Sequence, residues 1–289
     1  MTGSCIIDGF DIATIGMFVL RGGDLDLLTF PDRKEPQKNE WFEHDGDDVD
    51  LTEVYFNAKK TTIKYYLNAV SGLEFITRLE AFQSLMLSSG TRSIYLSEFD
   101  KTFMLRYTGC SAFSQKGGLI KSGRKSAEIT VDYMMDDPLQ IFDLNITEPM
   151  SNKANDTFVK LNAIELKNFG ITVKKIYDTF LALPDVKEGL VRSSGRMSGQ
   201  TVDVNFTPKR QSRKLAVDCY MKAATRDEFY RNYNALFNQL AKPQALTVTI
   251  NNTTDINCYY NSMSGFSKLR AFSNGIFIQF TIHLTEVFL

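Results

Sequence analysis

The stretch Ser71-Gly72-Leu73-Glu74-Phe75 has the form of a helix start, and a matching stretch, Thr225-Arg226-Asp227-Glu228-Phe229, follows 154 residues later. In each, Ser or Thr precedes Glu by three positions. This is a capping box, which satisfies backbone N–H groups at the first turn and is worth typically ~1 kcal/mol. Apolar residues then recur on one helical face: Phe75, Leu79, Phe82 and Met86, and in the second stretch Phe229, Tyr233, Leu236 and Leu240. We therefore predict two amphipathic helices of roughly four to five turns, stopped by Gly90 and Pro243.

The two helix starts belong to a longer repeat. Six further pairs of segments match in the same order, with offsets between about 150 and 159 residues. These pairs are residues 10–12 and 169–171, 30–35 and 183–188, 56–60 and 206–210, 66–69 and 220–223, 107–113 and 260–266, and 129–133 and 280–284. For example, Phe30-Pro31-Asp32-Arg33-Lys34-Glu35 recurs as Leu183-Pro184-Asp185-Val186-Lys187-Glu188. Six matches in register predict an internal duplication.

Outside the helices, both halves contain short runs of β-branched and aromatic residues, several of them alternating with polar residues. That pattern is typical of half-buried strands. We predict strands at residues 61–67, 93–96, 101–107, 127–133, 214–220, 246–250, 256–260 and 276–284. The polar run Asn251-Asn252-Thr253-Thr254-Asp255 predicts a hairpin turn. The fold class is therefore α+β, with a helix covering a sheet in each of two tandem units and no βαβ nucleotide-binding arrangement.

A polar stretch separates the two repeats. Residues 138–160 include Pro138, Pro149 and the run Ser-Asn-Lys-Ala-Asn-Asp at 151–156, a composition typical of a linker. Leu139, Ile141 and Phe142 predict that the first part of this linker packs against a unit. The chain then divides into a first unit at residues 1–137, the linker at 138–160 and a second unit at 161–289. Its 289 residues agree with about 150 residues per domain.

The composition is that of a globular protein, with 43% hydrophobic and 23% charged residues. Because 33 basic residues balance 34 acidic ones, a general polycationic attraction to DNA or membranes is excluded. Four scattered cysteines without CxxC spacing predict neither a zinc site nor a disulfide scaffold and fit a reducing compartment. We expect no signal peptide and no membrane insertion, because the first residues lack a basic region and no stretch approaches ~18 apolar residues.

The sequence predicts no catalytic residue, no cofactor-binding residue and no cofactor. The chain has only two histidines, and it lacks the phosphate-binding, nucleophile-elbow and zinc-protease motifs. His283 lies in an alternating strand, where a structural role is expected, and His44 has no neighbouring Ser or Cys suited to nucleophilic activation.

A run of carboxylates between Glu43 and Glu53 is the strongest candidate for a cation site, since Ca²⁺ prefers such oxygen ligands. Gly46 comes too early for the calcium-loop pattern, so we interpret the run as a solvated acidic loop and assign no metal ligand. Whether residues 43–53 bind a cation stays open at this point.

The two repeats have diverged in charge. Residues 31–53 contain nine acidic and three basic residues, whereas the corresponding residues 187–200 contain three basic residues and one acidic residue. One hypothesis is that the units alternate around a ring, with the acidic loop of one unit beside the basic loop of the next; drift of exposed loops is the other. The basic pairs Lys59-Lys60 and Lys209-Arg210 are interpreted as solvated or interface loops, and residues 116–125 as a basic, glycine-rich hairpin tip.

The pattern of the unit resembles the tail-tube fold of bacteriophage tails, specifically distal tail and baseplate hub proteins. The resemblance rests on residues 10–12, the Phe30-Pro31-Asp32 turn, the helix start at Ser71 and Glu74, and the last strand at 129–133. It implies strand-rich, tail-tube-like β-sandwich or barrel units, present twice in tandem. It also implies a structural virion protein at the tail tip, assembled in the host cytoplasm, and not an enzyme.

In that family, tube-fold units form six-fold rings through which the genome passes. The resemblance therefore implies a ring of this chain with itself, either a pseudo-hexameric homotrimer or a homohexamer. The tail tube and other baseplate proteins would be further partners, and DNA would be a transient cargo in the lumen. Two other classes stay open: a duplicated β-rich carbohydrate- or receptor-binding module, and an enzyme with scattered carboxylates.

Overall fold

The computed structural model describes residues 4–116, 122–150, 154, 158–189, 191–202, 205, 207–269 and 275–288. Within them, the first half contains β1 (Cys5–Ile7), β2 (Phe10–Asp11), η1 (Ile12–Ile15), β3 (Met17–Val19), η2 (Leu25–Leu28), β4 (Lys38–Asn39), β5 (Asp48–Val49), β6 (Lys59–Ser71), α1 (Gly72–Met86), β7 (Arg92–Leu96), β8 (Lys101–Lys116) and β9 (Ser122–Met135). The second half contains β10 (Val159–Leu161), β11 (Ile164–Glu165), η3 (Leu166–Phe169), β12 (Ile171–Lys175), α2 (Tyr177–Phe180), β13 (Val191–Arg192), β14 (Thr201–Val202), β15 (Lys214–Ala223), α3 (Arg226–Leu240), β16 (Leu246–Ile250), β17 (Thr254–Lys268) and β18 (Ile276–Glu286). The η elements are 3-10 helices.

Each half of the described chain builds a seven-stranded antiparallel sheet. The strand orders are β2-β1-β7-β8-β9-β6-β3 and β11-β10-β16-β17-β18-β15-β12, so equivalent strands occupy equivalent places. The register agrees as well: the β8–β9 ladder shifts directly after Tyr107, and the β17–β18 ladder shifts directly after Tyr260. The α+β class is confirmed. Descent of the halves from a duplication, and the unit boundaries, stay predictions.

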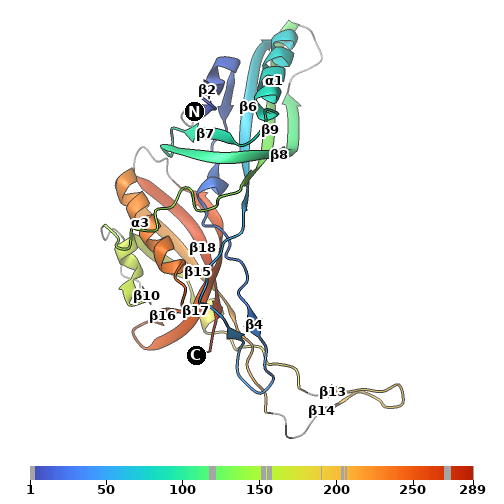
Figure 1. Cartoon of the computed structure of the whole chain (residues 1–289), viewed down its shortest axis with the longest axis vertical. Coiled ribbons are helices and arrows are strands. Elements are labelled where there is room, and N and C mark those ends of the chain that lie inside the picture. Colours follow the sequence, from blue (N-terminus) through green and yellow to red (C-terminus); the bar gives the residue numbers. More distant parts are fainter. Residues whose placement is uncertain are drawn as a thin grey trace.

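The two sheets lie one beyond the other along the long axis of the molecule, with α1 on one and α3 on the other (Figure 1). The segment that carries β4 leaves the first half and runs beside the second half. The small β13–β14 hairpin projects away from the body (Figure 1). The second half is therefore in contact with a long loop of the first half, while the β13–β14 hairpin of its own equivalent loop projects from the body.

Both long helices begin where the capping boxes predict. Ser71 Oγ accepts a hydrogen bond from the Glu74 N–H at 3.2 Å, and Thr225 Oγ1 accepts one from the Glu228 N–H at 3.1 Å. The two Glu carboxylates accept from the N–H groups of Val70 and Ala224, one residue before each cap. The predicted apolar faces pack on the sheets: Phe75, Phe82, Met86, Phe229, Tyr233, Leu236 and Leu240 are buried, and Leu79 is half-buried. The prediction lacked the short helix α2.

All eight predicted strands are confirmed, and the hairpin turn at Asn251 and Asn252 is confirmed by their positive φ angles. The long strands extend beyond the predicted ends, since β8 reaches Lys116 and β17 reaches Lys268. The short strands, such as β2 and β11, were not predicted. The hairpin tip 117–121, the linker residues 151–153 and 155–157, and Phe206 of the repeat lie outside the described residues.

The two helices differ in how much of their surface is covered. On α1 the buried residues are Phe75, Phe82 and Met86, whereas α3 buries ten residues, among them polar Asn232 and Gln239. The linker supplies part of this cover: the Asn232 Oδ1 accepts from the Met150 N–H at 2.7 Å. Ile141 is buried and Leu139 and Phe142 are partly buried, as predicted for a linker that packs.

One basic pair is placed differently from the prediction. Lys59 is the first residue of β6 and is buried, so a solvated or interface loop is wrong for this residue. Its Nζ donates to the carbonyl oxygens of Leu27 at 3.0 Å and Thr29 at 2.7 Å, at the end of η2. Burial lowers the pKa of Lys59 to about 7, against the opposing charges of Asp26 and Asp32.

The buried Lys59 predicts a pH dependence of folding. The unfolded chain holds this proton up to a pKa of ~10.4, so between pH 7 and pH 9.5 the unfolded state binds more protons and the free energy of unfolding rises with pH. We expect this contribution to approach ~3 kcal/mol. Urea unfolding followed by circular dichroism should show a flatter pH dependence for Lys59→Met than for the native chain. The control Lys60→Met, at an exposed position of the same strand, should keep the native dependence; equal dependence in both variants would contradict the assignment.

Candidate functional site

The two halves are joined by a contact that combines aromatic packing, backbone hydrogen bonds and ion pairs. We call residues 28–34, which leave the first sheet after η2, the strap. The Phe30 side chain in the strap is only 2% exposed, because it lies among aromatic side chains of the second half. Its ring stacks on Tyr233 at a centroid distance of 4.3 Å and on Phe237 at 4.8 Å, both on α3. The strap therefore inserts an anchor residue into the core of the other half.

Three hydrogen bonds join the strap backbone to the second half. The Tyr233 hydroxyl donates to the Leu28 carbonyl at 2.7 Å, and the Tyr260 hydroxyl donates to the Pro31 carbonyl at 3.1 Å. The Arg33 N–H donates to the Asn261 carbonyl at 2.8 Å. Burial raises the pKa of both tyrosines well above the ordinary value, so their hydroxyl groups remain donors at any physiological pH.

The strap lies along an edge of β17 that no other strand of the described sheet pairs with. β17 pairs with β16 through residues 254–258 and with β18 through residues 258–268. Within the described sheet, the edge of β17 that faces β16 therefore has no strand beside it beyond Cys258. Unpaired edges expose backbone donors and acceptors and are normally covered. The bond from Arg33 to Asn261 shows that the strap supplies cover here.

The turn between β7 and β8 makes a second contact, at the start of α3. The Tyr230 hydroxyl donates to the Phe99 carbonyl at 2.6 Å, and the Lys101 ammonium lies 4.5 Å from the centre of the Tyr230 ring. Arg226 pairs with Asp100 at 3.3 Å. These contacts cover the outward face of the first helical turns of α3.

A buried charge cluster lies close to this turn. Lys268 of β17 pairs with Glu98 and lies 3.9 Å from Asp24, so two carboxylates of the first half share one ammonium group of the second half. Burial raises the pKa of Asp24 to about 6, although Lys268 acts in the opposite direction. The contact between the halves thus combines aromatic packing with buried ion pairs.

The acidic loop makes the third contact. The Gly46 N–H donates to the Arg210 carbonyl at 2.7 Å, and the Arg210 guanidinium pairs with Asp45 at 3.1 Å. The Lys187 ammonium donates to the Trp41 carbonyl at 2.7 Å and to the Gly46 carbonyl. Gly46 has a φ of +65°, and a Cβ at this position would lie 2.0 Å from the Phe288 ring, so only glycine fits.

The acidic loop therefore faces basic side chains of the other repeat within the same chain. Its basic partner Lys187 belongs to the predicted basic loop, and its basic partner Arg210 belongs to the second basic pair. Arg210 is half exposed and contacts the first half of its own chain, so its role as a solvated or interface residue stays a prediction. Arg192 and Arg196 of the basic loop are exposed. Charge complementarity between the repeats is thus present within the chain.

The carboxylates of the candidate cation site point to different partners. Asp45 pairs with Arg210, Asp47 lies 3.5 Å from Lys38, and Asp50 accepts from the Thr52 hydroxyl. The part of the chain described by the structure contains no group of three or more His, Cys, Asp or Glu side chains placed to hold a metal ion. His283 lies on β18, as predicted, with its Nε2 2.6 Å from the Ser264 hydroxyl; its structural role stays a prediction.

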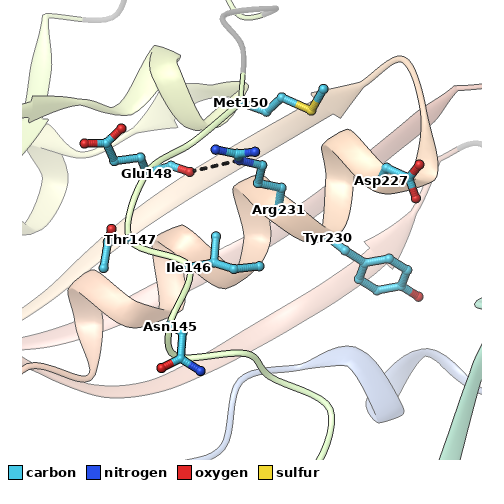
Figure 2. Close-up of a pocket in the computed structure, with 8 residues that line it drawn as sticks. All are labelled: Asn145, Ile146, Thr147, Glu148, Met150, Asp227, Tyr230 and Arg231. Atoms are coloured by element: carbon cyan, nitrogen blue, oxygen red, sulfur yellow. Dashed lines mark hydrogen bonds between the residues drawn. The ribbon is translucent and has the colours of Figure 1, made fainter.

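A shallow pocket, not predicted from the sequence, lies between the linker and the N-terminal part of α3 (Figure 2). Its volume is about 680 Å³. The lining residues are Asn145, Ile146, Thr147, Glu148, Met150, Asp227, Tyr230 and Arg231. Arg231 Nε donates to the Glu148 carbonyl at 3.4 Å, which holds the linker against the helix (Figure 2). The pocket lies next to the contact between the halves, since Tyr230 belongs to both.

No protein-family model and no curated protein matches the chain. Among solved structures, it is similar to the SPP1 Dit (gp 19.1) protein, described as a paradigm of the hub adsorption apparatus in phages that infect Gram-positive bacteria. The identity is 13%, the match covers 99% of each chain, and the TM-score is 0.32. A likeness this weak carries no weight for function, which has to be inferred from the contacts within the chain itself. In the described part of the chain, no helix combines the length and the apolar character that crossing a membrane requires.

The strap anchor predicts a large difference between two equivalent positions. Phe30→Ala removes a fully packed aromatic ring and should lower the free energy of unfolding by about 3–5 kcal/mol. Leu183, its partner in the repeat, is 94% exposed, so Leu183→Ala should change the free energy of unfolding of the monomer by less than about 0.5 kcal/mol. Urea unfolding, at a dilution where light scattering shows monomers, measures both. Similar losses in the two variants would contradict the role of Phe30 as the anchor.

Proposed function

We propose that this chain is a structural protein of a phage tail tip that forms a pseudo-hexameric ring, joins the tail tube to the baseplate and lets the genome pass. Its units are residues 1–137 and 161–289, connected by residues 138–160. Three chains, each contributing two units, make the ring; six chains are the alternative stoichiometry. The protein works in the virion and assembles in the host cytoplasm.

The observation that carries the proposal is the contact between the halves. It is a head-to-tail contact, in which the strap of one sheet unit covers the strand edge of the next unit. Contacts of this type generate closed rings when their rotation closes. Because the two sheets share one strand order, a contact of this kind can be used between chains as well as within one.

The proposed role is structural and not enzymatic. We propose no catalytic, cofactor-binding or metal-binding residue. The proposed partners are other copies of the chain, the tail tube and neighbouring baseplate proteins. DNA is a transient cargo of the lumen. The resemblance of residues 10–12, 30–32, 71–74 and 129–133 to tail-tube proteins supports this role.

The proposal is tested by the mass and shape of the purified protein. Native mass measurement should give three or six copies, and negative-stain images should show a ring with a central hole. The reason is that every chain has one strand edge with unpaired backbone groups, and all of these edges gain a partner only when the ring closes. A compact monomer at every concentration, together with a specific hit on a glycan array, would instead favour the duplicated carbohydrate- or receptor-binding module.

A further inference from the structure

We infer that the edge of β8 from Arg106 to Lys116 binds the strap-equivalent segment of a second copy of this chain, residues 181–187. The contact repeats between chains the one that the strap makes with β17 inside the chain. This inference deepens the proposed ring by naming its surface. It depends on self-association of the chain but not on a role in a phage.

The two straps are held in the same way by their own units. The Lys34 N–H donates to the Tyr55 carbonyl at 2.8 Å, and the Lys187 N–H donates to the Lys209 carbonyl at 2.7 Å. One bridge joins Arg33 to Phe56, and the equivalent bridge joins Val186 to Arg210. Residues 183–187 are therefore presented by the second half as residues 30–34 are presented by the first half.

The two strand edges are equivalent as well. β8 pairs with β7 through residues 101–105 and with β9 through residues 106–116, the same division as in β17. Within the described sheet, the edge of β8 beyond Leu105 has no strand beside it. In the second half this edge is covered by the strap, whereas residues 110–116 of β8 are exposed.

Side chains at matched positions show which surface is uncovered. Phe30 is 2% exposed and its partner Leu183 is 94% exposed. On the receiving strand, Phe266 is 8% exposed and its partner Phe113 is 48% exposed. On the receiving helix, Tyr230 is partly buried, while Ile76 at the equivalent position of α1 is 53% exposed. Phe30, Phe266 and Tyr230, which the chain covers at the contact between its halves, thus each have an exposed apolar partner on the free surfaces.

The equivalence defines the expected contacts. The Val186 N–H of one chain donates to the Thr108 carbonyl of the next, because Thr108 and Asn261 are the residues at which the two ladders shift register. The hydroxyl of Tyr107, which matches Tyr260, donates to the Pro184 carbonyl. Leu183 packs on Leu79 and the stem of Gln83, which stand where Tyr233 and Phe237 receive Phe30. An aliphatic anchor therefore meets an aliphatic surface, as an aromatic anchor meets aromatic rings inside the chain.

Charge agrees with the same arrangement. β13 and β14 pair Val191 with Val202, and β4 and β5 pair the equivalent residues Lys38 and Val49. The basic loop of the second half therefore corresponds to the acidic loop of the first half. The acidic loop packs over Phe288 at the end of β18. At the equivalent end of β9 the chain has Asp137 and also Asp136, which pairs with Arg106 at 2.7 Å. The exposed Arg192 and Arg196 of a neighbouring chain would thus approach carboxylates.

A disulfide cross-link between chains tests the geometry. Residues joined across a backbone hydrogen bond lie within reach of a disulfide. In a Cys110→Ser background, which removes the exposed native thiol, Val186→Cys protein mixed with Thr108→Cys protein should give a covalent dimer on mild oxidation. Neither protein alone should give this product. Glu80→Cys, at an exposed position of α1, replaces Thr108→Cys in the control mixture and should not cross-link. A control mixture that cross-links equally well would overturn the inference.

A charge in the contact tests its energetics. Leu183→Asp should weaken self-association by at least tenfold in sedimentation experiments, while the melting curve of the dilute monomer stays native. Leu87→Asp is the control, because Leu87 is a leucine just beyond α1 that is 72% exposed, against 94% for Leu183. It should assemble like the native chain.

The outcomes separate the inference from the proposed function. If the chain forms rings and Leu183→Asp assembles normally, the inferred surface is wrong while the ring stands. If the chain assembles through this surface into open filaments without a central hole, the surface is right and the proposed function falls. A chain that stays monomeric at every concentration overturns both.

Discussion

The structure depends on one constraint: where a long β-strand extends beyond the neighbouring strand, its unpaired edge has to be covered. In the second half, β16 stops pairing at Cys258 while β17 continues to Lys268. The strap closes this gap with one backbone bond, two tyrosine hydroxyls and the buried ring of Phe30. The aromatic cluster on α3, the packed linker and the buried Lys268 cluster all lie around this contact. Cover of a strand edge thus determines how the two halves are joined.

The same constraint is the basis of the assembly that we propose. The first half has the same long strand and the same short neighbour, but no strand of the described sheet pairs with that edge, and residues 110–116 are exposed. The chain also has a second strap, residues 181–187, whose anchor residue Leu183 is exposed and not inserted into a core. A free donor surface at one end and a free acceptor surface at the other are what a head-to-tail ring needs.

Much of the fold could be predicted from the sequence, because local chemistry determines it. Ser71 and Thr225 cap their helices through their own side chains, and the alternation in β16 requires no knowledge of its neighbours. The site could be predicted only in part. The match between Phe30 and Leu183 can be seen in the sequence repeat. Whether each residue is buried depends on whether another unit packs against it, which the repeat does not reveal. For the same reason Lys59 was placed on the surface: two carbonyl groups from η2, distant in sequence, receive its ammonium group. The pocket beside Tyr230 has no sequence signal, since the linker forms one of its walls.

We propose that one contact is used twice, once within the chain and once between chains. Hydrogen exchange followed by mass spectrometry, on the dilute monomer and on the assembled protein, tests it most directly. Amides that gain a partner exchange more slowly. On assembly, exchange should slow in residues 106–113 and 183–187, while residues 28–34 and 259–266 should be protected in both states. Slowing elsewhere with no change in residues 106–113 and 183–187 would contradict the account.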